Sequence, residues 1–477
     1  MNGRIILGNA VSLFISNVLV RLVSAAAAIL IARYLQVHDF GILSVGLAFS
    51  AIAGSFTDLG LTHTLIREGT KPGADHPRLV SSFLRIRLVL ALATVGVSAV
   101  LIGGLYSDPF LRRILYLTVI PAVFGAALQG VGNIYFQIIQ KMKYTALISG
   151  ISGLITAGAL FAGIAFHWRL ELIAAVYGFS GLIGGTFSIW MVTRRIPIRH
   201  GWDPALLRGL LAFTAGGFVV MFLPQLGPLI LEKVAGLQQV GYFAAAFRIP
   251  AMLYQVPGIL AAAFYPLLFR LGNEQDLPAH LELNTMELKL MSLLGMLMAL
   301  PFLLYAPWWI ATLFGPGWAP VAGVLKVLAM AVVLQSINFP LADALTTTGL
   351  QPRRTAVLTL ALLWGWAAYY FLGSRYGSQG GGLAALAVEG LLTVGFLLAN
   401  PNGPRLFTRG LRYNLPVFGL VYLTGMWWGR RLSPWLGIPL TEALFALFVL
   451  ALDQDLRRRV LALWASFRRP HPDRSAD

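Results

Sequence analysis

The sequence contains no cysteine, and only 12% of its 477 residues are charged. Without cysteine, disulfide bridges and thiolate metal sites are excluded. Soluble proteins carry about 25% charged residues, and no soluble fold could hide a chain of which 57% is hydrophobic. The shortage of charge therefore predicts an all-α integral membrane protein that crosses the bilayer many times.

The chain also lacks the motifs of several enzyme classes. It has no GxxxxGK[ST] loop, no HExxH and no GxSxG, so an ATPase acting alone, a zinc protease of this type and a serine hydrolase are excluded. The longest connection between apolar segments, 63–82, is too short for an extramembrane domain that could hold the acceptor of a sugar-transfer enzyme. We therefore expect no catalytic residue, no metal site and no cofactor, apart from H⁺ or Na⁺ as a candidate coupling ion.

Basic residues outnumber acidic ones, 36 against 19, but no long basic soluble domain is present, so nucleic acid is not an expected partner. The excess lies in short loops, as the positive-inside rule requires. With the N-terminus in the cytoplasm, cytoplasmic segments hold about 24 Lys and Arg, and outer segments about 8. Both termini are therefore predicted to be cytoplasmic.

Apolar windows of about 20 residues predict about fourteen membrane spans. They lie roughly at 9–32, 40–62, 83–106, 112–136, 144–166, 170–193, 207–231, 240–268, 285–307, 318–345, 354–373, 380–400, 413–429 and 435–452. We expect a six-helix N-terminal lobe at 1–200, a six-helix C-terminal lobe at 201–402 and two further helices at 403–453. The basic tail at 454–477 has the pattern of an interfacial helix on anionic lipid, or is frayed.

A faint internal repeat supports the division into two lobes. Residues 29–49 read ILIARYLQVHDFGILSVGLAF, and residues 229–249 read LILEKVAGLQQVGYFAAAFRI. Both run from an apolar helix through a basic residue and a polar turn to a glycine, Gly41 or Gly241, at the start of the next helix. Because six spans is an even number, both halves enter the membrane from the same side. The repeat is therefore predicted to be parallel, with its pseudo-two-fold axis along the membrane normal.

Two arginines, Arg21 and Arg248, fall deep inside predicted spans, away from the span ends. A charge at the centre of a bilayer costs about 2.5–3.5 kcal/mol on insertion scales, so each needs a watery cavity or a partner. We predict that both line a central cavity and bind an anionic substrate, because the guanidinium fork donates bidentately to phosphate. The alternatives are an ion pair of Arg21 with Asp58 and snorkelling of Arg248 to the headgroups. Lys289 and Lys326 are further candidates for the cavity, or interfacial residues.

The buried acids Glu389, Asp58 and Asp343 are candidates for coupling to a proton or cation. Glu389 is the deepest of the three in its predicted span, which makes it the best candidate. Asp58 and Asp343 lie near the cytoplasmic ends of their spans, where capping a helix is the alternative role.

The predicted span at 207–231 contains Gly216, Gly217, Pro224 and Pro228. Proline removes a backbone hydrogen bond and kinks a helix. We expect this span to bend and to act as a gate beside the cavity; a static kink that only shapes packing is the alternative.

Two stretches resemble a known family, 32–68 (ARYLQVHDFGILSVGLAFSAIAGSFTDLGLTHTLIRE) and 240–271 (VGYFAAAFRIPAMLYQVPGILAAAFYPLLFRL). They are similar to the polysaccharide transporter family, the Wzx-like O-antigen flippases of the multidrug/oligosaccharidyl-lipid/polysaccharide superfamily. The markers are Phe40-Gly41, Asp58-Leu59-Gly60, Arg67-Glu68 and Val240-Gly241-Tyr242. The resemblance covers roughly residues 1–400.

The resemblance implies two six-helix lobes, two further helices and alternating access through a cationic lumen, which Arg21 and Arg248 fit. The implied substrate is an undecaprenyl-pyrophosphate-linked oligosaccharide, turned from the inner to the outer leaflet of a prokaryotic cytoplasmic membrane. Membrane lipids and the polysaccharide polymerase are the other implied partners. A lipid II flippase shares the fourteen-helix plan and remains an alternative. A cation-coupled drug exporter is disfavoured, because such exporters typically carry an acid in the first helix.

Overall fold

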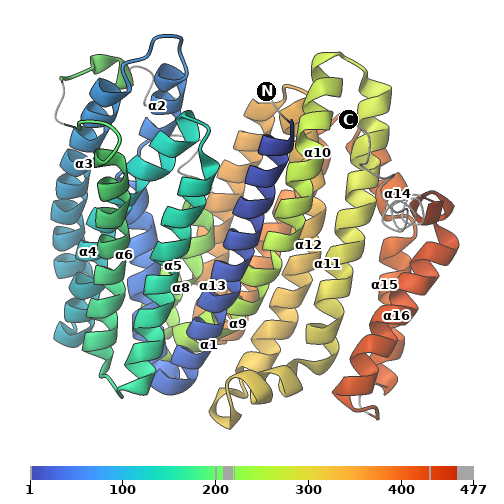
Figure 1. Ribbon diagram of the computed structural model, residues 1–477. Coiled ribbons are helices and arrows are strands. Elements are labelled where there is room, and N and C mark those ends of the chain that lie inside the picture. Colours follow the sequence, from blue (N-terminus) through green and yellow to red (C-terminus); the bar gives the residue numbers. More distant parts are fainter. Residues whose placement is uncertain (1–2, 199–200, 208–218, 220, 429–430, 459–477) are drawn as a thin grey trace, which may run out of the picture. The chain divides into compact units, whose positions relative to one another are not determined.

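The computed structural model describes residues 3–198, 201–207, 219, 221–428 and 431–458, with side chains from residue 23 onward. Every regular element in these ranges is a helix (Figure 1), and ten of the described helices are long and apolar enough to cross a membrane. The predicted all-α membrane class is therefore confirmed.

The helices and the predicted spans correspond in a simple way. The long helices α1 (Gly3–Ser55) and α13 (Gln351–Ala399) each hold two predicted spans, because each is broken by one non-helical residue, Gln36 or Gly377. The helices α9 (Leu237–Leu253) and α10 (Gln255–Asn273) together form one span. The expected span at 207–231 falls largely on residues outside the described ranges.

The chain divides into two compact units. Unit 1 consists of Met1–Arg248, Ile310–Val324 and Leu362–Ala384. Besides α1 and most of α9, it contains α2 (Leu61–Gly69), α3 (His76–Leu105), α4 (Pro109–Ile138), α5 (Met142–Ala165), α6 (Leu170–Thr193), η1 (Pro204–Leu207), η2 (Leu223–Gln225), α8 (Leu226–Ala235) and η3 (Pro316–Trp318).

Unit 2 consists of Ile249–Trp309, Leu325–Ala361 and Ala385–Asp477. It contains α10, most of α11 (Leu277–Leu313), most of α12 (Val321–Thr347), both ends of α13, and α14 (Gly403–Leu411), α15 (Asn414–Trp428) and α16 (Pro434–Leu452). The expected N-terminal lobe at 1–200 lies wholly in unit 1, whereas the residues expected in the C-terminal lobe are shared by both units. The lobe boundaries therefore stay a prediction.

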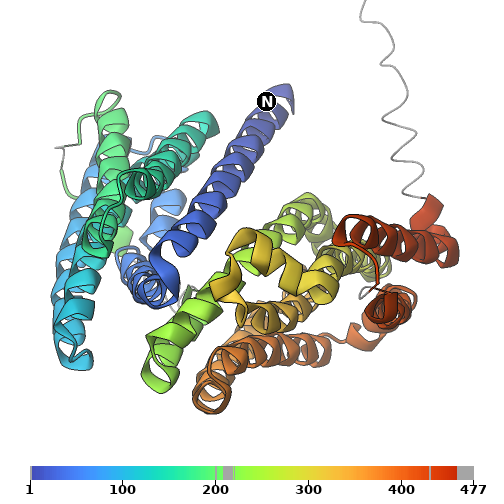
Figure 2. The same cartoon turned by 90° about the horizontal axis from the view of Figure 1, so that it is seen from below.

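In unit 1, α4 packs against α3, α5 and α6, and Figures 1 and 2 both show these helices side by side. The core between them is aromatic and aliphatic: it includes Phe83 of α3, Phe136 of α4, Ile148 of α5 and Val192 of α6, all fully buried. This packing fixes the orientation of α4, α5 and α6, and with it the direction in which their polar side chains point.

Both α3 and α11 begin with the same capping pattern. Asp75 and Asp276 each accept a hydrogen bond of 3.1 Å from the backbone amide three residues on, and Pro77 and Pro278 occupy the first turn. A capping carboxylate and an early proline both favour the start of a helix. Each helix therefore begins several residues before the apolar window that predicts it, and charged residues at the start of that window lie well inside the helix.

The internal repeat is visible in the backbone. The turn between the two halves of α1 has Gln36 at φ 66°, ψ 174°, and the turn between α8 and α9 has Gly236 at φ 87°, ψ 166°. Positive φ is costless for glycine and unfavourable for glutamine. Two equivalent positions of the repeat thus adopt the same uncommon conformation, which supports the predicted parallel repeat.

Candidate functional site

Unit 1 contains a cavity of about 340 Å³ with walls from α1, α4, α5, α6 and α9. With about 30 Å³ of liquid volume per water molecule, this space holds a phosphate-sized group together with several waters. The polar groups on its walls are the hydroxyls of Ser24, Ser149, Ser152, Thr156 and Tyr177, the amide of Gln129 and the guanidinium of Arg248.

Among the described residues that line this cavity, Arg248 is the only charged one. Its Nε is buried and has no hydrogen-bond partner among the described residues, and no described carboxylate forms an ion pair with it. Its Cζ lies 5.9 Å from the centroid of the Phe40 ring. A guanidinium with an unpartnered Nε in a polar cavity has the chemistry to bind an anion.

One face of α5 supplies the hydroxyl groups. Ser149, Ser152 and Thr156 follow each other at helical spacing, so they lie on the same side of the helix. The Ser152 hydroxyl lies 3.4 Å from Gln129 Oε1, and the Thr156 hydroxyl lies 3.0 Å from that of Ser180. These groups can both donate and accept hydrogen bonds, so this wall suits water, a sugar or a phosphate oxygen.

For three residues predicted to act here the structure gives no side-chain position or no position at all. Arg21 belongs to α1, but its side chain is not among those described, and Gly216 and Gly217 lie outside the described residues. Pro224 lies in the short 3₁₀ helix η2, and Pro228 lies in the first turn of α8 that follows it. The backbone is thus irregular at Pro224, while the gate stays a prediction.

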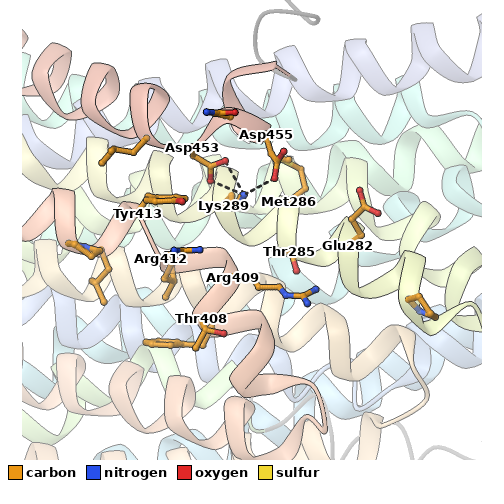
Figure 3. A pocket seen from close by; sticks show the side chains of 17 residues that line it. Glu282, Thr285, Met286, Lys289, Thr408, Arg409, Arg412, Tyr413, Asp453 and Asp455 are labelled. Carbon is orange, nitrogen blue, oxygen red and sulfur yellow. Dashed lines mark hydrogen bonds and ion pairs between the residues drawn. The ribbon is translucent and has the colours of Figure 1, made fainter.

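Lys289 and Lys326 do not line the Arg248 cavity. The Lys289 Nζ lies 2.8 Å from Asp453 Oδ2 and 3.9 Å from Asp455 Oδ2 (Figure 3). This ion pair borders a larger pocket of about 1240 Å³ in unit 2, lined by residues of α11, α14, α15 and the end of α16. Lys326 is exposed on α12. Lys289 therefore ties α11 to the end of α16, and its charge is already balanced.

Asp58 caps α2 and pairs with a cation. Its Oδ1 accepts from the amide of Thr62 at 3.2 Å and from the hydroxyl of Thr62 at 2.6 Å. The same oxygen lies 3.2 Å from Nη1 of the buried Arg87, whose Nη2 donates to Thr57 Oγ1 and to the Ala126 carbonyl. Arg87 lies about three turns into α3 and is 5% exposed, so this ion pair is in the interior of unit 1.

Glu389 on α13 is held by neutral groups. Asn338 Nδ2 of α12 donates to Glu389 Oε2 at 2.7 Å, and the Thr393 hydroxyl donates to Asn338 Oδ1 at 2.7 Å. No described cation pairs with this carboxyl group. Its role in ion coupling stays a prediction.

Asp343 on α12 lies beside a second acid, Glu287 on α11, which the sequence reasoning did not single out. The span was expected to start at 285, which places Glu287 at a membrane surface. The Asp276 cap was the signal that could have placed it deeper, because it starts the helix at Leu277.

Comparison with known proteins gives two matches in sequence. Residues 6–272 match the family described as polysaccharide biosynthesis protein. The chain is also 22% identical, over 336 residues, to the lipopolysaccharide biosynthesis protein WzxC of Escherichia coli (strain K12). That alignment covers 66% of this chain and 64% of WzxC, so the chain spans slightly less than two thirds of this relative.

Solved structures with the same fold come from two kinds of transporter. The lipid II flippase MurJ in an inward closed conformation matches with a TM-score of 0.69 and 16% identity, over 91% of this chain and 97% of that one. An inward-facing multidrug resistance MATE family transporter of the MOP superfamily matches with a TM-score of 0.62 and 15% identity, over 82% and 98%. At these identities the matches show that the chain has this transporter fold.

Proposed function

Because the chain belongs to the polysaccharide biosynthesis protein family, we propose that it is a flippase for a polyprenyl-pyrophosphate-linked oligosaccharide. It would turn this lipid from the inner to the outer leaflet of the cytoplasmic membrane, with both termini in the cytoplasm. The similarity to WzxC and the fold shared with a lipid II flippase support a transporter rather than an enzyme.

The observation that carries this proposal is the unpaired Arg248 guanidinium in the polar cavity of unit 1. Keeping a cation away from bulk water without a counter-ion is costly. A pyrophosphate would supply the missing charge and accept a hydrogen bond from the unpartnered Nε. The hydroxyls of α5 would then contact phosphate oxygens or the first sugar.

Arg21 extends the same argument along α1. At 3.6 residues per turn, positions 21, 24 and 28 share one face of a helix, and Ser24 and Ala28 both line the cavity. A second arginine on that face would let the site hold both phosphates of the headgroup. The polyprenyl tail would stay in the hydrocarbon, and a polymerase would receive the glycan on the outer side.

Binding of undecaprenyl pyrophosphate to the purified protein tests the proposal. R248A should weaken this binding and should make the lipid-linked precursor accumulate on the inner leaflet in cells, at normal protein levels. K326A is the matched control, because Lys326 is exposed and lines neither cavity. Equal binding by wild type and R248A would overturn the proposal.

Lipid II is the second candidate substrate, because MurJ shares the fold over most of this chain. Both lipids carry a polyprenyl pyrophosphate, so the anion site alone does not separate them. Competition between lipid II and an oligosaccharide-linked lipid for the purified protein does: preference for lipid II would replace the oligosaccharide as the substrate.

A further inference from the structure

Two acidic side chains meet between α11 and α12 in unit 2. Glu287 of α11 is 0% exposed and Asp343 of α12 is 6% exposed. Asn284 links the two positions, because it donates both to Glu287 and to the carbonyl of Pro340, three residues before Asp343, and the two acids interact electrostatically. Two neighbouring carboxylates at a buried site repel each other, which favours the state in which the pair holds one proton.

A buried amide joins this pair to both helices. Asn284, which is 1% exposed, donates from Nδ2 to Glu287 Oε2 at 3.0 Å and to the Pro340 carbonyl at 2.9 Å. Its Oδ1 has no partner among the described residues, and the same is true of Glu287 Oε1 and Asp343 Oδ2. The site therefore has more buried acceptors than donors. A proton bound to one carboxyl group would add a donor and reduce this excess of acceptors.

One positive group, Arg354 of α13, interacts electrostatically with Asp343 without forming an ion pair. Its Nη1 donates to the Thr346 hydroxyl at 2.8 Å, and none of the ion pairs among the described residues joins Arg354 to either acid. The other titratable group here is His280 of α11, whose Nε2 is engaged with the Thr347 hydroxyl at 2.7 Å. One carboxylate balanced at a distance by Arg354 and one protonated carboxyl is the charge state that this arrangement favours.

We propose that Glu287 and Asp343 form a binding site for one proton, in which the protonated Glu287 donates to Asp343. Loss of the proton would place two like charges in contact between α11 and α12, and their repulsion would favour separation of these helices. The protonation state would thereby be linked to helix packing. That this link drives the movement of substrate is a further step, which rests on the proposed function.

Labelling with dicyclohexylcarbodiimide tests the site without any transport assay, because this reagent modifies protonated carboxyl groups in apolar surroundings. Peptide mapping of the purified full chain at neutral pH should find the label on Glu287. Glu282, on the same helix but lining the open pocket of unit 2, is the internal control and should stay unlabelled. Labelling of Glu287 no stronger than that of Glu282 would overturn the proposal.

Two variants sharpen this test. E287Q should lose the label and keep the fold, because glutamine can still accept from Asn284. In D343N the label should disappear at a lower pH than in the wild type, since the negative neighbour that retains the proton is gone. An unchanged pH profile in D343N would contradict a shared proton, and protection by Na⁺ at constant pH would assign the site to that ion instead. If E287Q misfolds, the D343N profile decides.

Proteoliposomes with a lipid-linked oligosaccharide and an imposed pH gradient test the coupling. Wild-type transport should respond to the gradient, whereas E287Q should not respond, although it still binds undecaprenyl pyrophosphate at the Arg248 site. If the wild type transports the lipid at the same rate with and without the gradient, proton coupling is contradicted, whereas the proposed flippase function is not. If the wild type transports nothing, the proposed flippase function is contradicted, and the proton site is then tested by the labelling experiment alone.

Discussion

Gly41 of α1 and Gly241 of α9 pack against each other in a reciprocal contact. A Cβ added to Gly41 would lie 2.0 Å from the carbonyl oxygen of Leu237, and one added to Gly241 would lie 2.0 Å from that of Val37. Each glycine thus contacts the backbone carbonyl that lies one helical turn before the other glycine. The two halves of the repeat meet here at equivalent residues, and only hydrogen at Cα allows this approach.

Alanine at either glycine should therefore destabilise unit 1. The clash is with backbone, which cannot move aside as a flexible side chain can, so G41A or G241A should cost about 1–3 kcal/mol. A lower melting temperature in detergent checks this. G158A is the control, because no atom lies within 4 Å of a Cβ built there, and helical Gly→Ala changes are neutral or stabilising at such sites. Equal melting of G41A and G158A would disprove the close contact.

Substitutions of Arg248 separate charge from shape. R248Q removes the charge and should weaken binding of undecaprenyl pyrophosphate about 10- to 100-fold, the loss of a charged hydrogen-bonded contact of about 1.5–3 kcal/mol. R248K keeps the charge but not the planar fork, so its affinity should lie between those of the wild type and R248Q. Titration of the purified variants measures this, and equal affinities of R248K and R248Q would argue against an electrostatic site.

The Asp58–Arg87 pair should be a stabilising link in unit 1. R87Q leaves Asp58 without its described counter-charge and should cost about 2–3 kcal/mol, less than the about 3–5 kcal/mol of fully buried pairs, because the Asp58 side chain is 24% exposed. The double variant D58N/R87Q should lose less than the sum of the single changes. R85Q is the control, since Arg85 is exposed. Strict additivity in melting experiments would show that the two charges do not interact.

The Lys289–Asp453 pair makes an analogous prediction for unit 2. K289M leaves the buried Asp453 carboxylate unpaired and should cost about 3–5 kcal/mol. The double variant K289M/D453N removes both charges and should recover part of this loss. Chemical or thermal unfolding of the two variants measures this. If K289M lowers the free energy of unfolding no more than the control K326M does, the pair contributes nothing to stability.

Much of the helical plan could be predicted from apolar windows and from the repeat. Hydropathy locates helices because the bilayer core demands about 20 apolar residues, and the turns at Gln36 and Gly236 lie between predicted spans. The cavity residue Arg248 was identified by its charge alone. Its neighbours on α5 were not, because hydroxyl side chains look ordinary in an apolar helix.

Where helices begin could be predicted less well than where they lie. The burial of Arg87 and of Glu287 was not foreseen, because the apolar windows begin later than α3 and α11 do. Hydropathy does not indicate where a helix is capped, whereas the Asp–X–Pro pattern at Asp75 and Asp276 marks the start of each helix. Which charges pair with which also could not be deduced, since the direction of a side chain depends on the neighbouring helices.

The turn at Gln36 has a consequence for the size of the Arg248 cavity. Ser24, Ala28 and Ile31 come from the part of α1 before this turn, and Phe40, Leu43 and Leu47 from the part after it. The two parts of α1, before and after Gln36, therefore form neighbouring walls of the same cavity. A change in the backbone angles of Gln36 would therefore alter the width of this cavity without any change within the bundle of α4, α5 and α6.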